Sequence, residues 1–91
     1  MNIRSNPQVH NNATIESQLR TKWAELLGID AGEISMQSDF FNLGGNSMLL
    51  LSLHIFVAQE FDLSVLIPDL IQNAVFVHMI ELIQNGIAME V

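Results

Sequence analysis

Hydrophobic residues recur at helical spacing in the first third of the chain. The apolar side chains between residues 15 and 27 fall at the intervals of an amphipathic helix, and mostly polar residues separate them. Thr14 is suited to cap the start of this segment, and Gly28 is suited to end it. The pattern therefore predicts a helix over residues 15–27, with Trp23 in its buried face.

A second and more strongly apolar segment occupies residues 47–60. Its hydrophobic residues run nearly all the way round the predicted helix, and a helix of this kind is normally buried. A chain of 91 residues cannot bury it on every side, so part of its apolar surface is expected to form an exposed interaction face. Met48, Leu51 and Ile55 lie at helical spacing along it, and core packing is the competing interpretation for Leu51 and Ile55.

Two further helices are predicted towards the C-terminus. Pro68 is favoured at the first helical position, which predicts a short helix over residues 68–72. The apolar spacing that follows predicts a last helix over residues 74–84, and Asn85 and Gly86 are expected to end it.

The segment between the first two predicted helices, residues 28–46, is a long connection with little periodicity. A loop of this length inside a compact domain is usually functional. The whole chain is thus predicted to be an all-α bundle with three longer helices, one short helix and a long first loop. We expect a flexible polar leader over residues 1–13, one folded domain over residues 14–86 and a C-terminal tail over residues 87–91.

Composition and charge exclude several classes of function. The net charge is −7, and no Lys or Arg follows Lys22, so the surface is unsuited to nucleic acid. The absence of cysteine excludes disulfides, thiolate catalysis and zinc–thiolate sites. No apolar stretch approaches the roughly 20 residues that cross a bilayer, and the N-terminal residues do not form a secretory signal. We therefore expect a cytoplasmic protein without a membrane partner.

The candidate chemistry lies where the long loop meets the second helix. Gly44 and Gly45 permit a tight turn and a close approach by another surface, and Asn46 and Ser47 follow them. The unpaired amides and the dipole at a helix start favour a phosphate, so a phosphate ester on Ser47 would be stabilised there. The competing interpretation is that Ser47 only caps the helix.

This segment resembles the attachment motif of the peptidyl and acyl carrier proteins. That family has an acidic residue, two aromatic or apolar residues, and then Leu-Gly-Gly-x-Ser followed by an apolar residue. The stretches 23–28 and 60–70 are also similar to the family, so the resemblance covers residues 14–84. It implies a four-helix bundle of the acyl carrier protein type. The matching motif residues are Asp39, Phe40, Phe41, Leu43, Gly44, Gly45, Ser47 and Met48.

The resemblance also implies a function. Ser47 would accept 4′-phosphopantetheine from coenzyme A through a separate phosphopantetheinyl transferase, which uses magnesium to hold the phosphates. The thiol of the arm would then carry an aminoacyl or acyl group as a thioester. Gly44, Gly45 and Asn46 would complete the attachment site. The expected partner-binding residues are Phe41, Leu43, Met48, Leu51 and Ile55.

Within the family, the chain is more similar to peptidyl carriers of nonribosomal peptide biosynthesis. Fatty-acid carriers more often have Asp directly before the serine and a strongly acidic second helix, whereas this chain has Asn46 there and only Glu60 near the helix end. It departs from the commoner peptidyl pattern at Asn46, at Met48 and at the Asn73–Ala74 pair. The implied partners are an adenylating enzyme and downstream condensing, tailoring or thioesterase enzymes, and the chain is expected to be a monomer.

Two alternatives to the peptidyl carrier stay open. One is an acyl carrier protein of fatty-acid or polyketide synthesis, and the other is a helical interaction adaptor that is never modified. An intrinsic enzyme is not expected, because His54 lies about 10 Å along the helix from Ser47 and no glycine follows the serine at the spacing of a nucleophile elbow. No group of histidines and carboxylates has the spacing of metal ligands.

Overall fold

The computed structural model describes residues 12–89 of the chain. These residues form four α-helices and one 3₁₀ helix, and within them the only β-type pairing is an isolated bridge between Asp39 and Val75. The prediction of an all-α bundle with three longer helices, one short helix and a long first loop is therefore confirmed. The elements are α1 (Asn12–Leu27), η1 (Ala31–Glu33), α2 (Ser47–Phe61), α3 (Ile67–Gln72) and α4 (Phe76–Met89).

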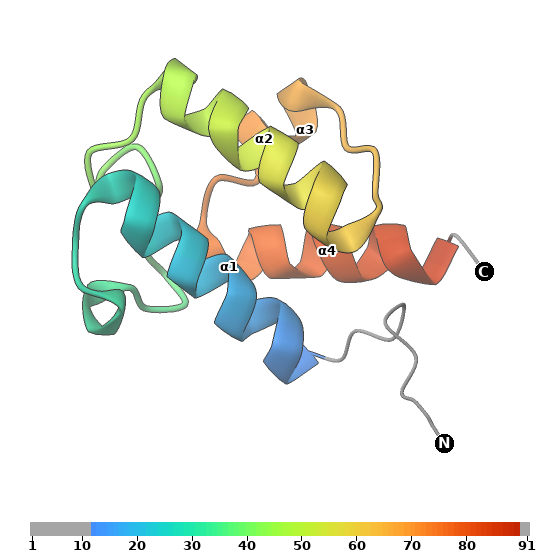
Figure 1. Ribbon diagram of the computed structural model, residues 1–91, viewed down its shortest axis with the longest axis horizontal. Coiled ribbons are helices and arrows are strands. Elements are labelled where there is room, and N and C mark those ends of the chain that lie inside the picture. The colour runs from blue at the N-terminus through green and yellow to red at the C-terminus, as the bar shows by residue number, and fades with distance from the viewer. Residues whose placement is uncertain (1–11, 90–91) are drawn as a thin grey trace.

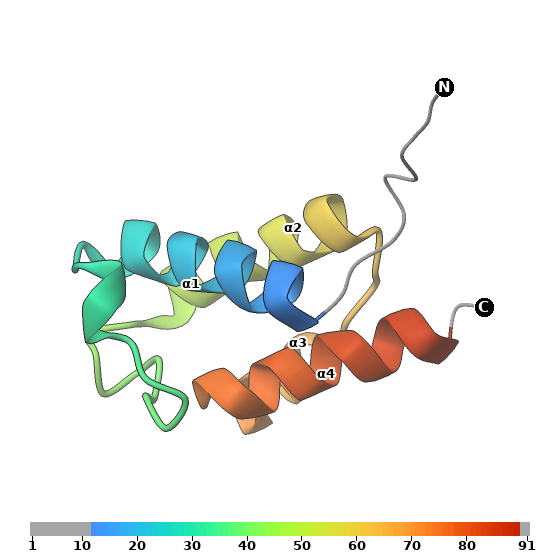
Figure 2. The ribbon, with the colours of Figure 1, turned by 90° about the horizontal axis from the view of Figure 1, so that it is seen from below.

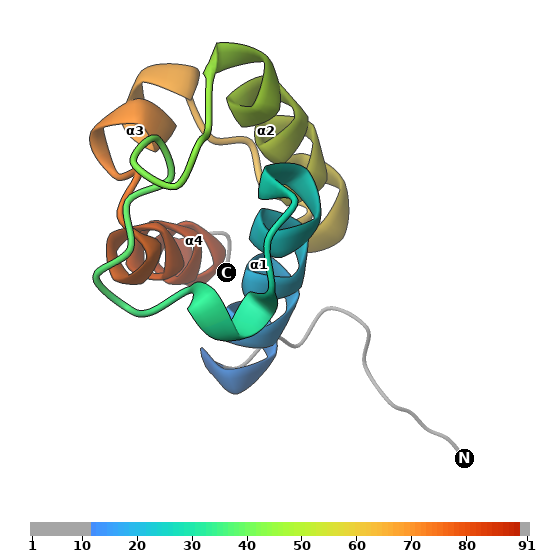
Figure 3. The same ribbon diagram turned by 90° about the vertical axis from the view of Figure 1, so that its left-hand side faces the viewer.

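The three longer helices pack around a common core. Helix α1 contacts both α2 and α4, while the short α3 packs beside α2 (Figures 1 and 2). The connection from α1 to α2, which includes η1, closes the end of the bundle drawn on the left of Figure 1. Seen from that end, the loop passes directly in front of the bundle and leads into α2 (Figure 3). The attachment motif predicted from the sequence therefore lies at one end of the molecule.

Within residues 13–87, whose side chains the structure describes, every buried residue is apolar. At the centre of the core, the ring of Trp23 from α1 makes edge-to-face contacts with Phe40 of the loop and Phe76 of α4, each with ring centroids 5.1 Å apart. This cluster joins the loop to two helices and confirms Trp23 as a core residue. The buried side chains are Ile15, Leu19, Trp23, Ile34, Phe40, Leu50, Leu53, Val57, Phe61, Leu63, Leu70, Ala74, Phe76, Met79, Ile80 and Ile83.

The start of the first helix differs from the prediction. Helix α1 begins at Asn12, so Thr14 lies inside the helix and does not cap it. Ala13 is a strong helix former, which lets the helix extend further towards the N-terminus. The end at Leu27, before Gly28, is as predicted. Residues 1–11, which make up most of the predicted flexible leader, lie outside the described residues, and the division into leader, domain and tail stays a prediction.

Both ends of the last helix also differ from the prediction, which gave residues 74–84. Helix α4 begins only at Phe76, because the backbone of Ala74 is paired with the long loop. It continues through Asn85 and Gly86 to Met89. Gly86 packs against Leu63, to which a Cβ at position 86 would approach within 2.7 Å. The Asn-Gly pair was therefore wrongly predicted to end the helix, and Gly86 instead allows a close contact between α4 and the loop after α2.

The segment between α2 and α3 is held by specific backbone features. Helix α2 ends at Phe61, and the next residue, Asp62, adopts the left-handed conformation with φ 51°. The Nε2 atom of His54 is 2.6 Å from the carbonyl oxygen of Val65, and this hydrogen bond ties the following loop to α2. Helix α3 then starts at Ile67, one residue before the predicted start at Pro68, which lies in its first turn. No helix in residues 12–89 is both long and apolar enough to cross a membrane.

Candidate functional site

The loop that leads to Ser47 is fixed to the start of α4. The amide of Phe40 donates to the carbonyl of Ala74 at 2.9 Å, and the amide of Phe76 donates to the carbonyl of Ser38 at 2.8 Å. A third bond, from the amide of Val77 to the carbonyl of Met36, extends this pairing at 2.9 Å. The residues before the turn are therefore anchored to the folded body, although they are neither helix nor strand.

The turn itself is built from hydrogen bonds within residues 39–45. The carboxylate of Asp39 accepts hydrogen bonds from the amides of Phe41 and Asn42 at 2.9 and 3.1 Å. The amide of Gly45 donates to the carbonyl of Phe40 at 2.9 Å, which folds the chain back on itself. Gly44 takes a φ of 108°, a conformation that other residues rarely adopt. The turn therefore needs the acidic residue and the glycine pair that the sequence motif contains.

Asn46, and not Ser47, caps α2. Its backbone is extended, and its side-chain Oδ1 accepts a hydrogen bond from the amide of Leu49 at 2.9 Å. Ser47 is the first helical residue, and its side chain is exposed. Among the described residues, no hydrogen-bond partner is seen for its Oγ atom. The competing interpretation of Ser47 as the cap of the helix is therefore wrong.

The electrostatic environment of Ser47 is set mainly by the start of the helix. From Ser47 to Gln59, α2 contains no Asp, Glu, Lys or Arg. The first amides of a helix have no intrahelical partner and carry the positive end of its dipole. The two basic residues of the described chain are both on α1, where Arg20 pairs with Glu16 and Lys22 pairs with Glu25, each at 2.7 Å. An exposed hydroxyl at a neutral helix start fits the attachment of a phosphate ester.

Exposed apolar side chains gather around the same end of the molecule and along α2. The exposed fractions are 78% for Met48, 47% for Leu51 and 55% for Ile55, so the strip predicted along this helix is open to solvent. Phe41 is exposed at 38%, whereas Leu43 is half-buried and packs against the core. Their role in partner binding stays a prediction.

Two exposed apolar residues were missed by the sequence analysis. Leu66 caps α3 and Ile71 lies within it, and both are exposed. Helix α3 packs beside α2 (Figure 3). The sequence contains no signal for this, because a helix of six residues is too short for its buried face to be recognised from periodicity.

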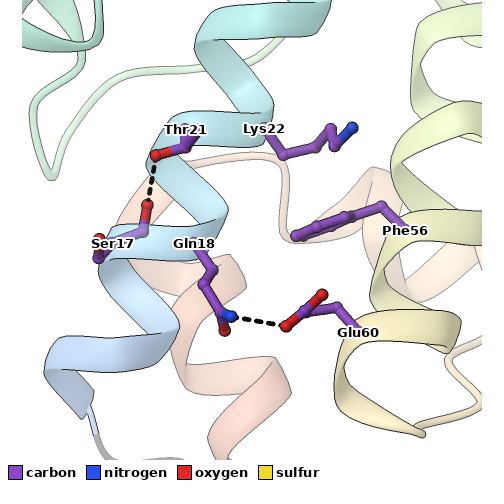
Figure 4. A pocket seen from close by; sticks show the side chains of 6 residues that line it. All are labelled: Ser17, Gln18, Thr21, Lys22, Phe56 and Glu60. Atoms are coloured by element: carbon purple, nitrogen blue, oxygen red, sulfur yellow. Dashed lines mark hydrogen bonds between the residues drawn. The ribbon is translucent and has the colours of Figure 1, made fainter.

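A separate groove of about 200 Å³ lies between α1 and α2. The amide of Gln18 donates to Glu60 across it at 2.5 Å, and the ammonium of Lys22 lies 5.2 Å from the centre of the Phe56 ring (Figure 4). Phe56 is nine residues beyond Ser47, or about 13 Å along the helix axis. The groove is thus distant from Ser47. The side chains that line it from α1 and α2 contact each other across it.

Comparison with known families identifies the motif. The family model described as a phosphopantetheine attachment site matches residues 17–83. The chain belongs to this family. Its members carry 4′-phosphopantetheine, and carrier domains of this kind hold a group for other enzymes rather than act as catalysts. The match includes α2, the glycine turn and the loop that fixes the turn, so the described site lies within the phosphopantetheine attachment domain.

Relatives of this phosphopantetheine attachment domain occur in very large fungal enzymes. It is 34% identical over 67 residues, or 74% of the chain, to the nonribosomal peptide synthetase gloA of Glarea lozoyensis. It is 36% identical over 75 residues, or 81% of the chain, to the polyketide synthase–nonribosomal peptide synthetase hybrid himA of Aspergillus japonicus. The matched parts are only 1% and 2% of these relatives' lengths. The similarity is therefore to one domain of each.

Solved structures agree with this assignment. One solved structure similar to this chain contains the T1 domain in a docking-domain complex of the Pax nonribosomal peptide synthetase. The match has a TM-score of 0.77 and 28% sequence identity, and it covers 97% of this chain and 83% of the other. The HMG-ACPI domain from the CurA module of Lyngbya majuscula has a TM-score of 0.74 and 20% identity, covering 99% of this chain and 94% of that one. The second comparison supports the fold alone. Both neighbours have the acyl carrier protein type of bundle that the sequence predicts.

Proposed function

We propose that Ser47 is the residue that accepts the 4′-phosphopantetheine arm, and that Gly44, Gly45 and Asn46 shape the turn that presents it. The observation that carries this proposal is the exposed position of Ser47 at the first residue of α2, while its neighbour Asn46 caps the helix. The hydroxyl is therefore available to an external enzyme, and the helix start favours the negative charge of the phosphate that it receives.

The attachment reaction is a phosphoryl-type transfer in which this chain is a substrate. The Oγ atom of Ser47 forms a bond to the phosphorus of the phosphopantetheine phosphate, and the bond from that phosphorus to the adenosine bisphosphate part of coenzyme A breaks. The hydroxyl proton passes to a base of the transferase, and adenosine bisphosphate leaves. Once attached, the arm supplies a terminal thiol that holds an aminoacyl or acyl group as a thioester.

Intact-mass measurement tests this assignment directly. The full chain is incubated with coenzyme A, magnesium and a broad-specificity phosphopantetheinyl transferase. We expect a mass increase of one arm for the parent chain and no increase for Ser47→Ala. Ser52→Ala is the matched control, because Ser52 is also exposed on α2 and its replacement leaves the attachment site intact. Arm addition to Ser47→Ala, or loss of addition in Ser52→Ala, would contradict the assignment.

The cargo and the pathway are proposed from the relatives. Because the domain is similar to parts of nonribosomal peptide synthetases and of polyketide–peptide hybrids, we infer that it carries an aminoacyl or acyl group in nonribosomal peptide-type biosynthesis. Its loading partner would then be an adenylating enzyme, and condensing, tailoring or thioesterase enzymes would take the cargo. Some of the relatives are polyketide synthase–nonribosomal peptide synthetase hybrids, so a polyketide carrier stays an alternative. In that case a malonyl-type transacylase would load the arm.

A loading assay separates these two proposals. The arm-bearing chain is offered to an adenylating enzyme with ATP and an amino acid or aryl acid, and in parallel to a transacylase with malonyl coenzyme A. Thioester formation with the first enzyme alone supports the peptide pathway, and formation with the second alone supports the polyketide pathway. An unmodified adaptor predicts no mass change in the attachment experiment, so that result would favour the third alternative.

The exposed apolar residues next to Ser47 are proposed to meet these partners. Met48 follows the acceptor directly, and Leu51 and Ile55 continue along the exposed side of α2. Phe41 lies in the turn that leads to the helix, while the half-buried Leu43 would contribute less area. Since the stretch from Ser47 to Gln59 contains no Asp, Glu, Lys or Arg, apolar contact would provide most of the attraction at this surface.

A further inference from the structure

Two residues that favour the N-cap of a helix stand side by side at the start of α2. Asn and Ser rank about equally at this position, so the sequence alone does not decide between them. In the structure Asn46 is the cap, and its Oδ1 accepts from the amide of Leu49 at 2.9 Å. If Ser47 were the cap instead, the helix would begin at Met48, and the Ser47 hydroxyl would accept a hydrogen bond from an amide of the first turn.

We infer that Asn46 is a positioning residue, which keeps the Ser47 hydroxyl free for arm attachment by occupying the cap itself. The inference rests on the proposed role of Ser47. Without the Asn46 side chain, the amide of Leu49 loses its partner. A helix that starts one residue later, at Met48, then gains a cap from the Ser47 hydroxyl. It loses the 2.9 Å hydrogen bond from the amide of Leu50 to the carbonyl of Asn46. The free energy gained from the Ser47 cap is similar in size to the free energy lost with this hydrogen bond. Helices that start at Ser47 and helices that start at Met48 should therefore both be populated in Asn46→Ala.

The preceding turn leaves Ser47 as the nearest substitute for the cap. Gly44 and Gly45 have no side chains, and a side chain at position 45 would collide with the ring of Phe40. The turn is also held by the bond from the amide of Gly45 to the carbonyl of Phe40. Residues before Asn46 therefore cannot replace its cap, whereas Ser47 is adjacent and its hydroxyl is exposed.

A double-mutant cycle on the full chain without the arm tests the cap exchange. Ser47→Ala is made in the parent, in Asn46→Ala and in Asn46→Asp, and thermal unfolding is followed by circular dichroism. In the parent and in Asn46→Asp, which keeps an acceptor oxygen, the loss of the Ser47 hydroxyl should change the melting temperature by less than about 2 °C. In Asn46→Ala the same change should lower it by about 2–5 °C, because the hydroxyl has become a cap.

Two further measurements distinguish positioning from a general loss of stability. The carbon chemical shifts of Ser47 should move from helical towards extended values in Asn46→Ala and stay helical in Asn46→Asp. With coenzyme A and the transferase, the kcat/KM of arm addition should fall by at least about twofold in Asn46→Ala, because only part of the population presents a free hydroxyl. Asn46→Asp should restore it to near the parent value.

The outcomes separate this inference from the proposed function. Equal effects of Ser47→Ala in all three backgrounds, with Ser47 shifts that stay helical, would overturn the role of Asn46 while leaving Ser47 as the acceptor. Failure of the parent chain to gain an arm would overturn the proposed function. The stability cycle needs no arm, so it still decides whether Asn46 prevents Ser47 from capping α2.

Discussion

Gly45 is held so close to Phe40 that a side chain has no room at this position. An ideal Cβ would lie 2.6 Å from the carbonyl oxygen of Phe40, in addition to its contacts with the ring. That oxygen belongs to the backbone and accepts the hydrogen bond from the amide of Gly45 itself. Rotation of the Phe40 ring therefore cannot relieve the contact, and the second glycine of the motif is required by packing, whereas Gly44 is required by its positive φ.

Replacement of Gly45 by alanine should lower the free energy of unfolding by about 1–3 kcal/mol, the usual cost of overpacking. Urea unfolding of the full chain, followed by circular dichroism, measures this loss. Gly32→Ala is the control, because no atom from outside its own stretch of chain lies within 4 Å of an ideal Cβ at position 32 and its φ lies outside the left-handed region. We expect a change within about 0.5 kcal/mol there. Equal stability of the two variants would be inconsistent with the close approach of Phe40.

At the scale of the helix, α2 places neighbouring leucines in opposite environments. Leu50 is 2% exposed and lies in the core, whereas Leu51 is 47% exposed. Leu50→Ala should therefore cost about 2–5 kcal/mol of unfolding free energy, and Leu51→Ala should change it by less than about 0.5 kcal/mol. If the exposed strip binds partners, Leu51→Ala should still slow loading by the adenylating enzyme. Unchanged loading kinetics for Leu51→Ala would remove this residue from the proposed docking surface.

Helix starts and stops were predictable where local chemistry decides them. The start of α2 after the glycine turn follows from such signals, and Pro68 predicts the start of α3 to within one residue, since the helix begins at Ile67. In α4, contacts between distant segments accompany both differences from the prediction: the long loop pairs with the backbone of Ala74 before the helix start, and Leu63 packs against Gly86 inside the helix. Neither contact can be predicted from the residues next to it in the sequence.

In the functional site, too, some features were predictable from the local sequence and others were not. The motif identifies Ser47 and the glycine turn, because their chemistry is local. Two adjacent residues with equal preference for the cap position cannot be ranked from sequence, so the choice of Asn46 over Ser47 required the structure. The exposure of Leu51 and Ile55 was also undecided, since a helix that is apolar on all sides does not reveal which side faces the core.

For the molecule as a whole, the long loop is anchored to the core through two buried side chains, Ile34 and Phe40. Phe40 is fully buried against Trp23, and backbone hydrogen bonds join residues 36–40 to residues 74–77. Helices α1 and α4 contact each other and also hold the loop through the Trp23 cluster. The turn that presents Ser47 is consequently supported by the same packing that stabilises the bundle, and it should not loosen independently.

Cooperative unfolding of loop and helices follows from this arrangement. Trp23 is the only tryptophan of the chain, and its ring contacts Phe40, so its fluorescence reports the docking of the loop. Far-ultraviolet circular dichroism reports the helices. Because the two share one core, both signals should give the same urea midpoint and the same slope, as in a two-state transition. A fluorescence transition at distinctly lower urea would mean that the loop detaches while the helices persist, and the turn before Ser47 would then be a separate, weaker unit of the fold.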